Sequence, residues 1–79
     1  MSIFYFKTED LDTVSLGDNG YDFPDLMSAI HEAKRLLAEM ALDGIPEQSG
    51  KRLSVEVSNA QRIPIAKLSL ELTISYAQT

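Results

Sequence analysis

The stretch "LMSAIHEAKRLLAEMALDG", residues 26–44, decides the fold of this chain. Its apolar residues recur at spacings of three and four, which is the period of a helix with one buried face. Asp25 before the stretch and Gly44 at its end suit the two ends of such a helix. The sequence therefore predicts one amphipathic helix with an apolar stripe made of Leu26, Ile30, Ala33, Leu37 and Met40 or Ala41, widened by Ala29 and Leu36.

The residues before this helix read as strands. The segment "SIFYFK", residues 2–7, is rich in aromatic and β-branched residues, with Phe4 and Phe6 on one face and Ile3 and Tyr5 on the other. Two shorter alternating pieces, residues 13–16 and 21–23, flank "GDNG". Because Asn-Gly favours tight hairpin turns, these two pieces are predicted to pair as a hairpin.

The residues after the helix alternate in the manner of two further strands. "RLSVEVS", residues 52–58, places Leu53, Val55 and Val57 on one face, and the alternation in residues 65–76 continues for twelve residues. A strand of that length would outrun its partner and have an end left to pair with the first strand or with another chain. The predicted fold is α+β: a small antiparallel sheet of about four strands with one helix on one face, in the order β-β(hairpin)-α-β-β, forming a single domain over residues 1–79.

Composition narrows the function. The chain has 79 residues, no cysteine and a net charge of −5, and six acidic residues against one basic residue in positions 1–25 account for the whole excess. Nucleic acids and anionic membranes attract basic surfaces, so neither is an expected partner. No targeting segment or membrane span is recognisable, which favours a cytoplasmic protein. A small domain without disulfides often gains stability by associating, which favours a homo-oligomer.

The acidic stretch around the predicted turn raises the question of a metal site. Asp18, Asp22 and Asp25 are weak candidate ligands, but a calcium loop started at Asp10 or at Asp18 lacks the glycine and the glutamate that it requires. A magnesium site, which needs fewer carboxylates, stays open. The favoured interpretation is structural: Asp18 shapes the turn, Asp22 lies on the polar face of a strand and Asp25 serves the start of the helix.

Catalytic chemistry finds little support in the sequence. His31 is the single histidine, and its helical neighbours Ser28 and Arg35 supply neither an orienting acid nor an oxyanion hole. We therefore expect an exposed or boundary histidine, no enzymatic activity and no cofactor. Helical spacing also predicts ion pairs from Arg35 to Glu32 and Glu39 on the solvent face of the helix.

The run "GDNGYDFPDLMSAIHEA", followed by "LSVEV" and a closing hydrophobic strand, resembles a family of short bacterial proteins of unknown function. That family combines an aromatic first strand, an acidic Asp-x-x-Gly turn, an Ala-rich helix started by Pro/Asp-Leu and a Val-Glu-Val strand. This chain departs from the pattern at Gly17, where the family often has aspartate. The resemblance implies the fold above and no particular activity, substrate or cofactor; it rests on Tyr5, Phe6, Gly20, Phe23, Pro24, Asp25, Leu26, Ala29, Ala33, Val55, Glu56 and Val57.

Three hypotheses follow from these observations. The favoured one is a non-catalytic interaction or regulatory module whose partner is a protein, including a second copy of itself in a homodimer. Phe4, Phe6 and Tyr76 are the candidate interface residues, because core packing does not have to absorb every aromatic side chain. The alternatives are a regulator that binds a small molecule or a divalent metal through the acidic N-terminal third, and, least favoured, an enzyme.

Overall fold

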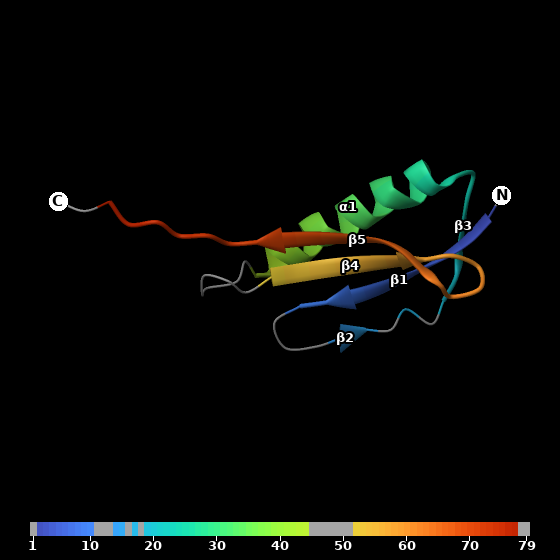
Figure 1. Cartoon of the computed structure of the whole chain (residues 1–79), viewed down its shortest axis with the longest axis horizontal. Coiled ribbons are helices and arrows are strands. Elements are labelled where there is room, and N and C mark those ends of the chain that lie inside the picture. The colour runs from blue at the N-terminus through green and yellow to red at the C-terminus, as the bar shows by residue number, and fades with distance from the viewer. Residues whose placement is uncertain (1, 11–13, 16, 18, 45–51, 78–79) are drawn as a thin grey trace.

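The computed structural model describes residues 2–10, 14–15, 17, 19–44 and 52–77. One helix, α1 (Leu26–Asp43), packs on one face of a five-stranded antiparallel sheet (Figure 1). This arrangement confirms the predicted α+β class and the order of the elements along the chain. The strands are β1 (Ser2–Glu9), β2 (Val14–Ser15), β3 (Tyr21–Phe23), β4 (Arg52–Ser58) and β5 (Pro64–Glu71).

The sheet runs in the order β2-β1-β4-β5, so β4 lies in its interior and β5 at one end. Two short strands pair with β1 along the edge that β4 does not occupy. β3 pairs with the beginning of β1, with Tyr21 opposite Phe4, and β2 pairs with its end, with Ser15 opposite Thr8. Among the described residues, β2 and β3 do not pair with each other. The predicted hairpin is therefore wrong, although both of its strands exist.

Two glycines explain why the chain follows β1 instead of turning back on itself. Gly17 has a φ of +63°, and a Cβ there would lie 1.7 Å from the carbonyl oxygen of Phe6. A Cβ on Gly20 would lie 2.6 Å from the Ile3 side chain. Glycine at these two positions therefore lets the chain lie close to the first strand, where a residue with a side chain would collide with it.

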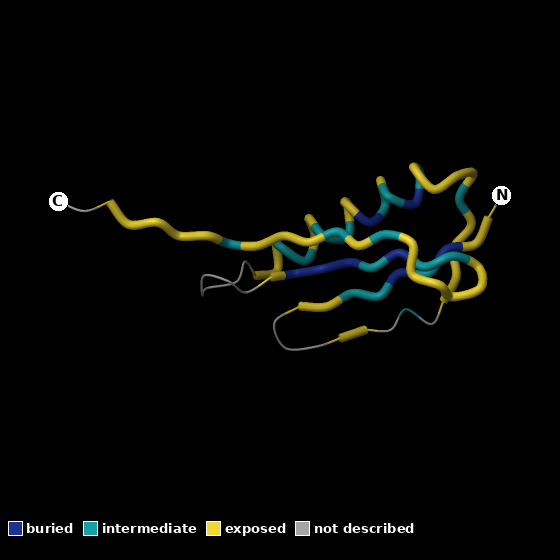
Figure 2. The backbone as a smooth tube through the Cα atoms, in the orientation of Figure 1, coloured by how far each residue is buried: buried dark blue, intermediate teal, exposed yellow. Residues whose placement is uncertain are grey.

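The core lies between α1 and the inner face of β1 and β4 (Figure 2). Phe4 and Phe6 of β1 are each 6% exposed, and Val55 and Val57 of β4 are fully buried. The helix contributes small residues at its closest approach and larger side chains around them. The buried cluster consists of Phe4, Phe6, Ala29, Ala33, Val55 and Val57, with Phe23, Ile30, Leu36, Leu37, Met40, Ala66 and Leu68 packed around it.

The predicted position of the helix is confirmed, and the structure shows which residues form the centre of its buried face. The most buried helical residues are Ala29 and Ala33, whereas Leu26 at the start of the predicted stripe is 39% exposed. Gly44 closes the helix, and its backbone N–H donates to the carbonyl oxygen of Met40 at 3.2 Å. The centre of the stripe lies on alanines because the first strand already fills the core with phenylalanine side chains.

The last two strands form a hairpin whose turn is organised by Asn59. Its side-chain oxygen accepts hydrogen bonds from the backbone N–H groups of Gln61 and Ile63, both at 3.0 Å. The final strand ends at Glu71, five residues before the predicted end at Tyr76. It ends there because its partner β4 begins at Arg52, directly opposite Glu71. Residues 72–77 lie outside any strand and run away from the body of the molecule in line with β5 (Figure 1).

Candidate functional site

The acidic residues singled out in the sequence do not gather into one site. Asp18 lies outside the described residues, so its predicted role in the turn has no structural counterpart here. Asp22 is exposed on β3, opposite Ile3, and Asp25 stands at the start of the helix. Across the part of the chain that the structure describes, three or more His, Cys, Asp or Glu residues nowhere come together as a metal site would require.

Asp25 serves the helix start, as the structural interpretation proposed. Its backbone is extended, and its carboxylate accepts a hydrogen bond from the backbone N–H of Ser28 at 2.8 Å. This is the N-cap arrangement, which satisfies one of the free N–H groups of the first turn. The same hydrogen bond lowers the pKa of Asp25, because it stabilises the charged carboxylate.

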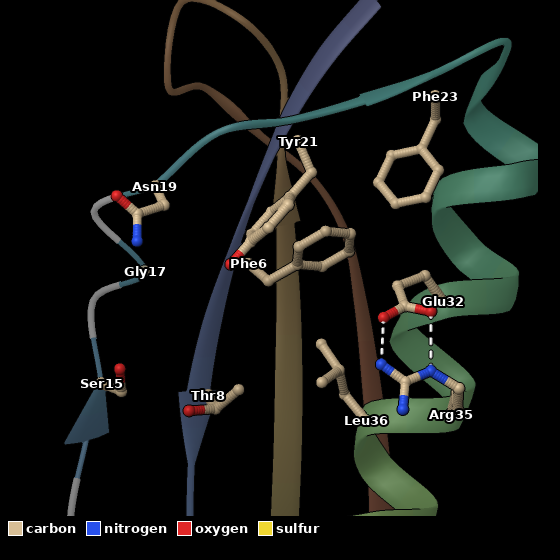
Figure 3. Close-up of a pocket in the computed structure, with 10 residues that line it drawn as sticks. All are labelled: Phe6, Thr8, Ser15, Gly17, Asn19, Tyr21, Phe23, Glu32, Arg35 and Leu36. Carbon is tan, nitrogen blue, oxygen red and sulfur yellow. Dashed lines mark hydrogen bonds and ion pairs between the residues drawn. The ribbon is translucent and has the colours of Figure 1, made fainter.

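A pocket of about 550 Å³ opens between α1 and the first three strands (Figure 3). Its volume falls in the range of small-molecule sites, about 300–1,000 Å³. The helix contributes Glu32, Arg35 and Leu36 on one side, and Figure 3 shows Tyr21 and Phe6 between these residues and the opposite wall. The strands and their connections contribute the remaining lining: Phe6, Thr8, Ser15, Gly17, Asn19, Tyr21 and Phe23.

Aromatic rings build the inner part of this pocket. Phe6 meets Phe23 edge to face with ring centres 5.8 Å apart, and it meets Tyr21 at 6.2 Å. Phe4 adds a further contact to Phe23 at 6.2 Å. These tilted arrangements are the favoured geometries of aromatic pairs. The cluster therefore first serves to hold β3 against β1 and the helix, and the pocket opens beside it.

The charged groups at the pocket are already paired. Arg35 donates from Nε to Glu32 at 2.8 Å and also forms ion pairs with Glu32 and Glu39, as helical spacing predicted. The hydrogen bond from Arg35 lowers the pKa of Glu32, and Glu32 in turn raises the pKa of Arg35. One guanidinium between two carboxylates leaves a net negative charge, so this group does not attract phosphate or carboxylate ligands.

The other residues considered for chemistry or binding are dispersed. His31 is exposed on the helix, as expected. Phe4 and Phe6 were candidate interface residues, but both lie in the core beneath α1, where they are inaccessible to a partner in this fold. Tyr76 is 85% exposed in the segment beyond β5.

The edge of the sheet formed by β5 is accessible, and the sequence analysis predicted part of it, namely a last strand longer than its partner. β5 pairs with β4 along one edge, and no strand among the described residues pairs with its other edge. Leu70 of β5 is 40% exposed and Ile74 beyond it is 41% exposed. The alternating pattern indicated a strand with an unpaired end, but the position of β5 at the end of the sheet could not be read from it.

The pocket was not predicted at all. Its helical wall was visible as the Glu32–Arg35 pair, but its other wall depends on β2 and β3 lying along β1. The misleading signal was Asn-Gly, which indicated a hairpin. The useful signal was the pair of glycines at positions 17 and 20, because glycine marks a close approach to a neighbouring strand as readily as a turn.

Comparison of the sequence with known proteins identifies the family of this chain. No curated protein and no solved structure shows significant similarity to the chain. No helix within the described ranges is long and apolar enough to span a membrane. The sequence profile of the domain of unknown function DUF6894 matches residues 3–71, from the first strand to the last residue of β5. The chain therefore belongs to the DUF6894 family, which agrees with the resemblance seen in its sequence.

Proposed function

We propose that this protein is a non-catalytic interaction module that associates with a second copy of itself through the open edge of its sheet. The observation that carries this proposal is the position of β5. It forms one end of the sheet, and its alternating sequence continues for five further described residues, 72–76, beyond the point where β4 begins at Arg52. The acidic N-terminal third supports a protein partner over nucleic acid or an anionic membrane, since both of those attract basic surfaces. The proposed location is the cytoplasm.

An open edge favours association for a simple reason. The outer side of an edge strand presents N–H and C=O groups that a second strand can pair with, and the apolar side chains beside it can then be covered. Here Leu70 and Ile74 are the apolar side chains on the same alternating face, and both are well exposed in the single chain. Pairing would cover both and give the residues directly after β5 a neighbouring strand.

The test is the mass of the full chain in solution, measured by sedimentation velocity from about 1 μM to about 1 mM, which spans weak to moderate association. We expect a monomer–dimer equilibrium. Ile74→Asp should weaken it at least tenfold, about 1.4 kcal/mol, because it places a charge in the paired segment. Leu42→Asp is the matched control: Leu42 is 87% exposed at the far end of α1, and the variant carries the same added charge.

Two results would contradict the proposal. The full chain could remain monomeric over the whole range of concentration, or Ile74→Asp could dimerise as well as Leu42→Asp does. Either result would remove the sheet edge as the site of association. Unfolding of both variants by denaturant should be measured beside the mass, so that loss of the fold is distinguished from loss of pairing.

A second candidate function is the binding of a small molecule, for which the pocket of about 550 Å³ is the specific observation. Its aromatic wall and its net acidic rim favour a neutral or cationic aromatic ligand. Benzylamine and benzoate are suitable probes of opposite charge. Amide chemical shifts of Tyr21, Glu32 and Leu36 should move with benzylamine and stay unchanged with benzoate; if neither probe moves them, this candidate is excluded.

A further inference from the structure

The outer face of the sheet, opposite α1, carries charged side chains in register. Lys7 of β1 lies opposite Glu56 of β4, and Glu56 lies opposite Lys67 of β5. Arg52 and Glu71 also lie opposite each other, and the Arg52 guanidinium is 3.2 Å from the Glu71 carboxylate. Opposite charges therefore face each other wherever charged residues meet across these strands, and such cross-strand pairs stabilise a sheet.

Two of these charged residues, Lys67 and Glu71, lie on β5 at the open edge of the sheet, where a second strand would meet them. A lysine on an edge strand normally discourages pairing with a second strand, because its charge would lie against uncharged or basic side chains of that strand. The same lysine favours a partner strand that places a carboxylate opposite it. The edge thus selects its partner by charge, and the question becomes which strand presents the matching order.

Resting on the proposed self-association, we infer that β5 pairs antiparallel with β5 of a second copy, with Ser69 on the two-fold axis. In a symmetric antiparallel pair, a residue n positions before the axis faces the residue n positions after it. Lys67 stands two positions before Ser69 and Glu71 two positions after it. Each lysine therefore faces a glutamate of the other copy, and the contact occurs twice.

Neighbouring registers lack this match. An axis on Lys67 would place two lysines opposite each other, and an axis on Glu71 would do the same with two glutamates. Axes on Leu68 or Leu70 would pair both charges with uncharged residues. An axis between two residues would set outward-facing side chains against inward-facing ones, which the pleat of the sheet does not allow.

The inner face agrees with the same register. Leu68 faces Leu70 of the second copy, and Ala66 faces Leu72, so that apolar residues meet on the side that α1 covers. Ile74 faces Pro64, so the pairing extends from the start of β5 into residues 72–74. These residues, which pair with no described strand in the single chain, lengthen β5 in the dimer.

The resulting assembly is a ten-stranded sheet with both helices on one face, because the two-fold axis stands perpendicular to the sheet. On the opposite face the charges alternate without interruption across the interface. The row runs through Lys7, Glu56 and Lys67 of one copy into Glu71 and Arg52 of the other. The register within each chain and the register between chains thus follow one electrostatic pattern.

The test exchanges the charges between copies. Lys67→Glu makes the paired positions of one strand both acidic, and Glu71→Lys makes them both basic. Each variant alone should dimerise at least about 4-fold more weakly than the unaltered chain, since two like-charge contacts replace two favourable ones. An equimolar mixture should form a heterodimer at least as readily as the unaltered chain. Lys7→Glu, which makes the same charge change away from the edge, should leave dimerisation unchanged.

A cross-link tests the axis directly, because the chain contains no other cysteine. Ser69→Cys should form an intermolecular disulfide under mild oxidation, since residues on the axis face each other within disulfide range. Thr73→Cys is the control: its two copies would lie about 27 Å apart in this register. Both positions are exposed.

The outcomes separate the register from the association. If the chain dimerises but the two charge variants do not recover on mixing, or Ser69→Cys cross-links no faster than Thr73→Cys, the register is wrong and the proposed function stands. If the unaltered chain is monomeric at every concentration, the proposed function fails and this inference fails with it.

Discussion

The strands β4 and β5 have nearly the same alternating sequence and opposite surroundings. Leu53 of β4 is 1% exposed, whereas Leu70, directly opposite it on β5, is 40% exposed. The cause is the number of neighbours, since β4 has a strand on each side and extensive contact with the helix, and β5 has a strand on one side and less contact with the helix. The comparison teaches that alternation defines the two faces of a strand and leaves open whether the strand is interior or at an edge.

The sharpest test of this comparison shortens both leucines. We expect Leu53→Ala to lower the free energy of unfolding by about 2–5 kcal/mol, since it leaves a cavity in a closed core. Leu70→Ala should lower it by less than half as much, because its side chain is already partly in water. Denaturant unfolding at low protein concentration measures both. Equal losses would show that the edge is as well packed as the interior. A loss for Leu70→Ala that grows with protein concentration would instead support pairing of the edge.

The first strand extends the comparison, because β2 and β3 pair with its two ends on the side away from β4. Gly17→Ala should disturb this cover. The positive φ alone costs about 1–3 kcal/mol for a residue with a side chain, and the added Cβ would collide with the backbone at Phe6. Gly44→Ala is the control, since nothing lies within 4 Å of a Cβ at that position. Thermal unfolding of the two variants should differ clearly; matching melting temperatures would mean that the chain can pass β1 by another path.

The helix contributes to the difference between the two strands, since it packs more extensively against β4 than against β5. Ala33 is fully buried at this contact. Ala33→Leu should overfill the space and lower the free energy of unfolding by about 1–3 kcal/mol. Ala38→Leu, on the exposed side of the same helix, should be neutral or slightly favourable. If the two variants were equally stable in urea, the helix would have to rest on the sheet less closely than the structure shows.

The smallest expected effect concerns acid stability and comes from two carboxylates in the first turns of the helix. The pKa of Asp25 and of Glu32 is lowered in the folded chain, by the hydrogen bonds from Ser28 and Arg35 respectively. Their stabilising contribution is therefore complete above the ordinary carboxyl pKa values, near 4, and is lost as the pH falls through the lowered folded values. Melting temperature measured from pH 6 to pH 2 should fall in this window. Asp25→Asn, which keeps the cap without the charge, should flatten the decline, and an unchanged profile would contradict the assignment.

Much of the fold could be predicted from local pattern. The 3.6-residue period defined the helix from its first turn to Gly44, and alternation separated Leu53, Val55 and Val57 from the polar face of their strand. Asp25 was correctly interpreted as part of the helix start. The candidate sites fared less well, because Phe4 and Phe6 proved to be core residues and the pocket beside Tyr21 was not foreseen.

These failures share one cause. A run such as "SIFYFK" shows apolar residues on both faces, but only the position of the helix decides which face is covered. The Asn-Gly pair was read as a turn between two strands, yet both strands find their hydrogen bonds on β1. Partners that are distant in the sequence leave no periodic signal, because each residue's neighbours in the sheet are chosen by the packing of the whole chain.

By itself, the sequence determined the α+β class, the order of the elements, the extent of the helix and the inward and outward faces of the last two strands. These properties depend on spacing within single segments, which each segment carries in its own residues. The tertiary structure alone decided that β4 is the interior strand, that β2 and β3 both lie along β1, and that β5 and the residues after it form an open edge. Those properties depend on which segments meet, and that is set by how one helix and five strands share a single small core.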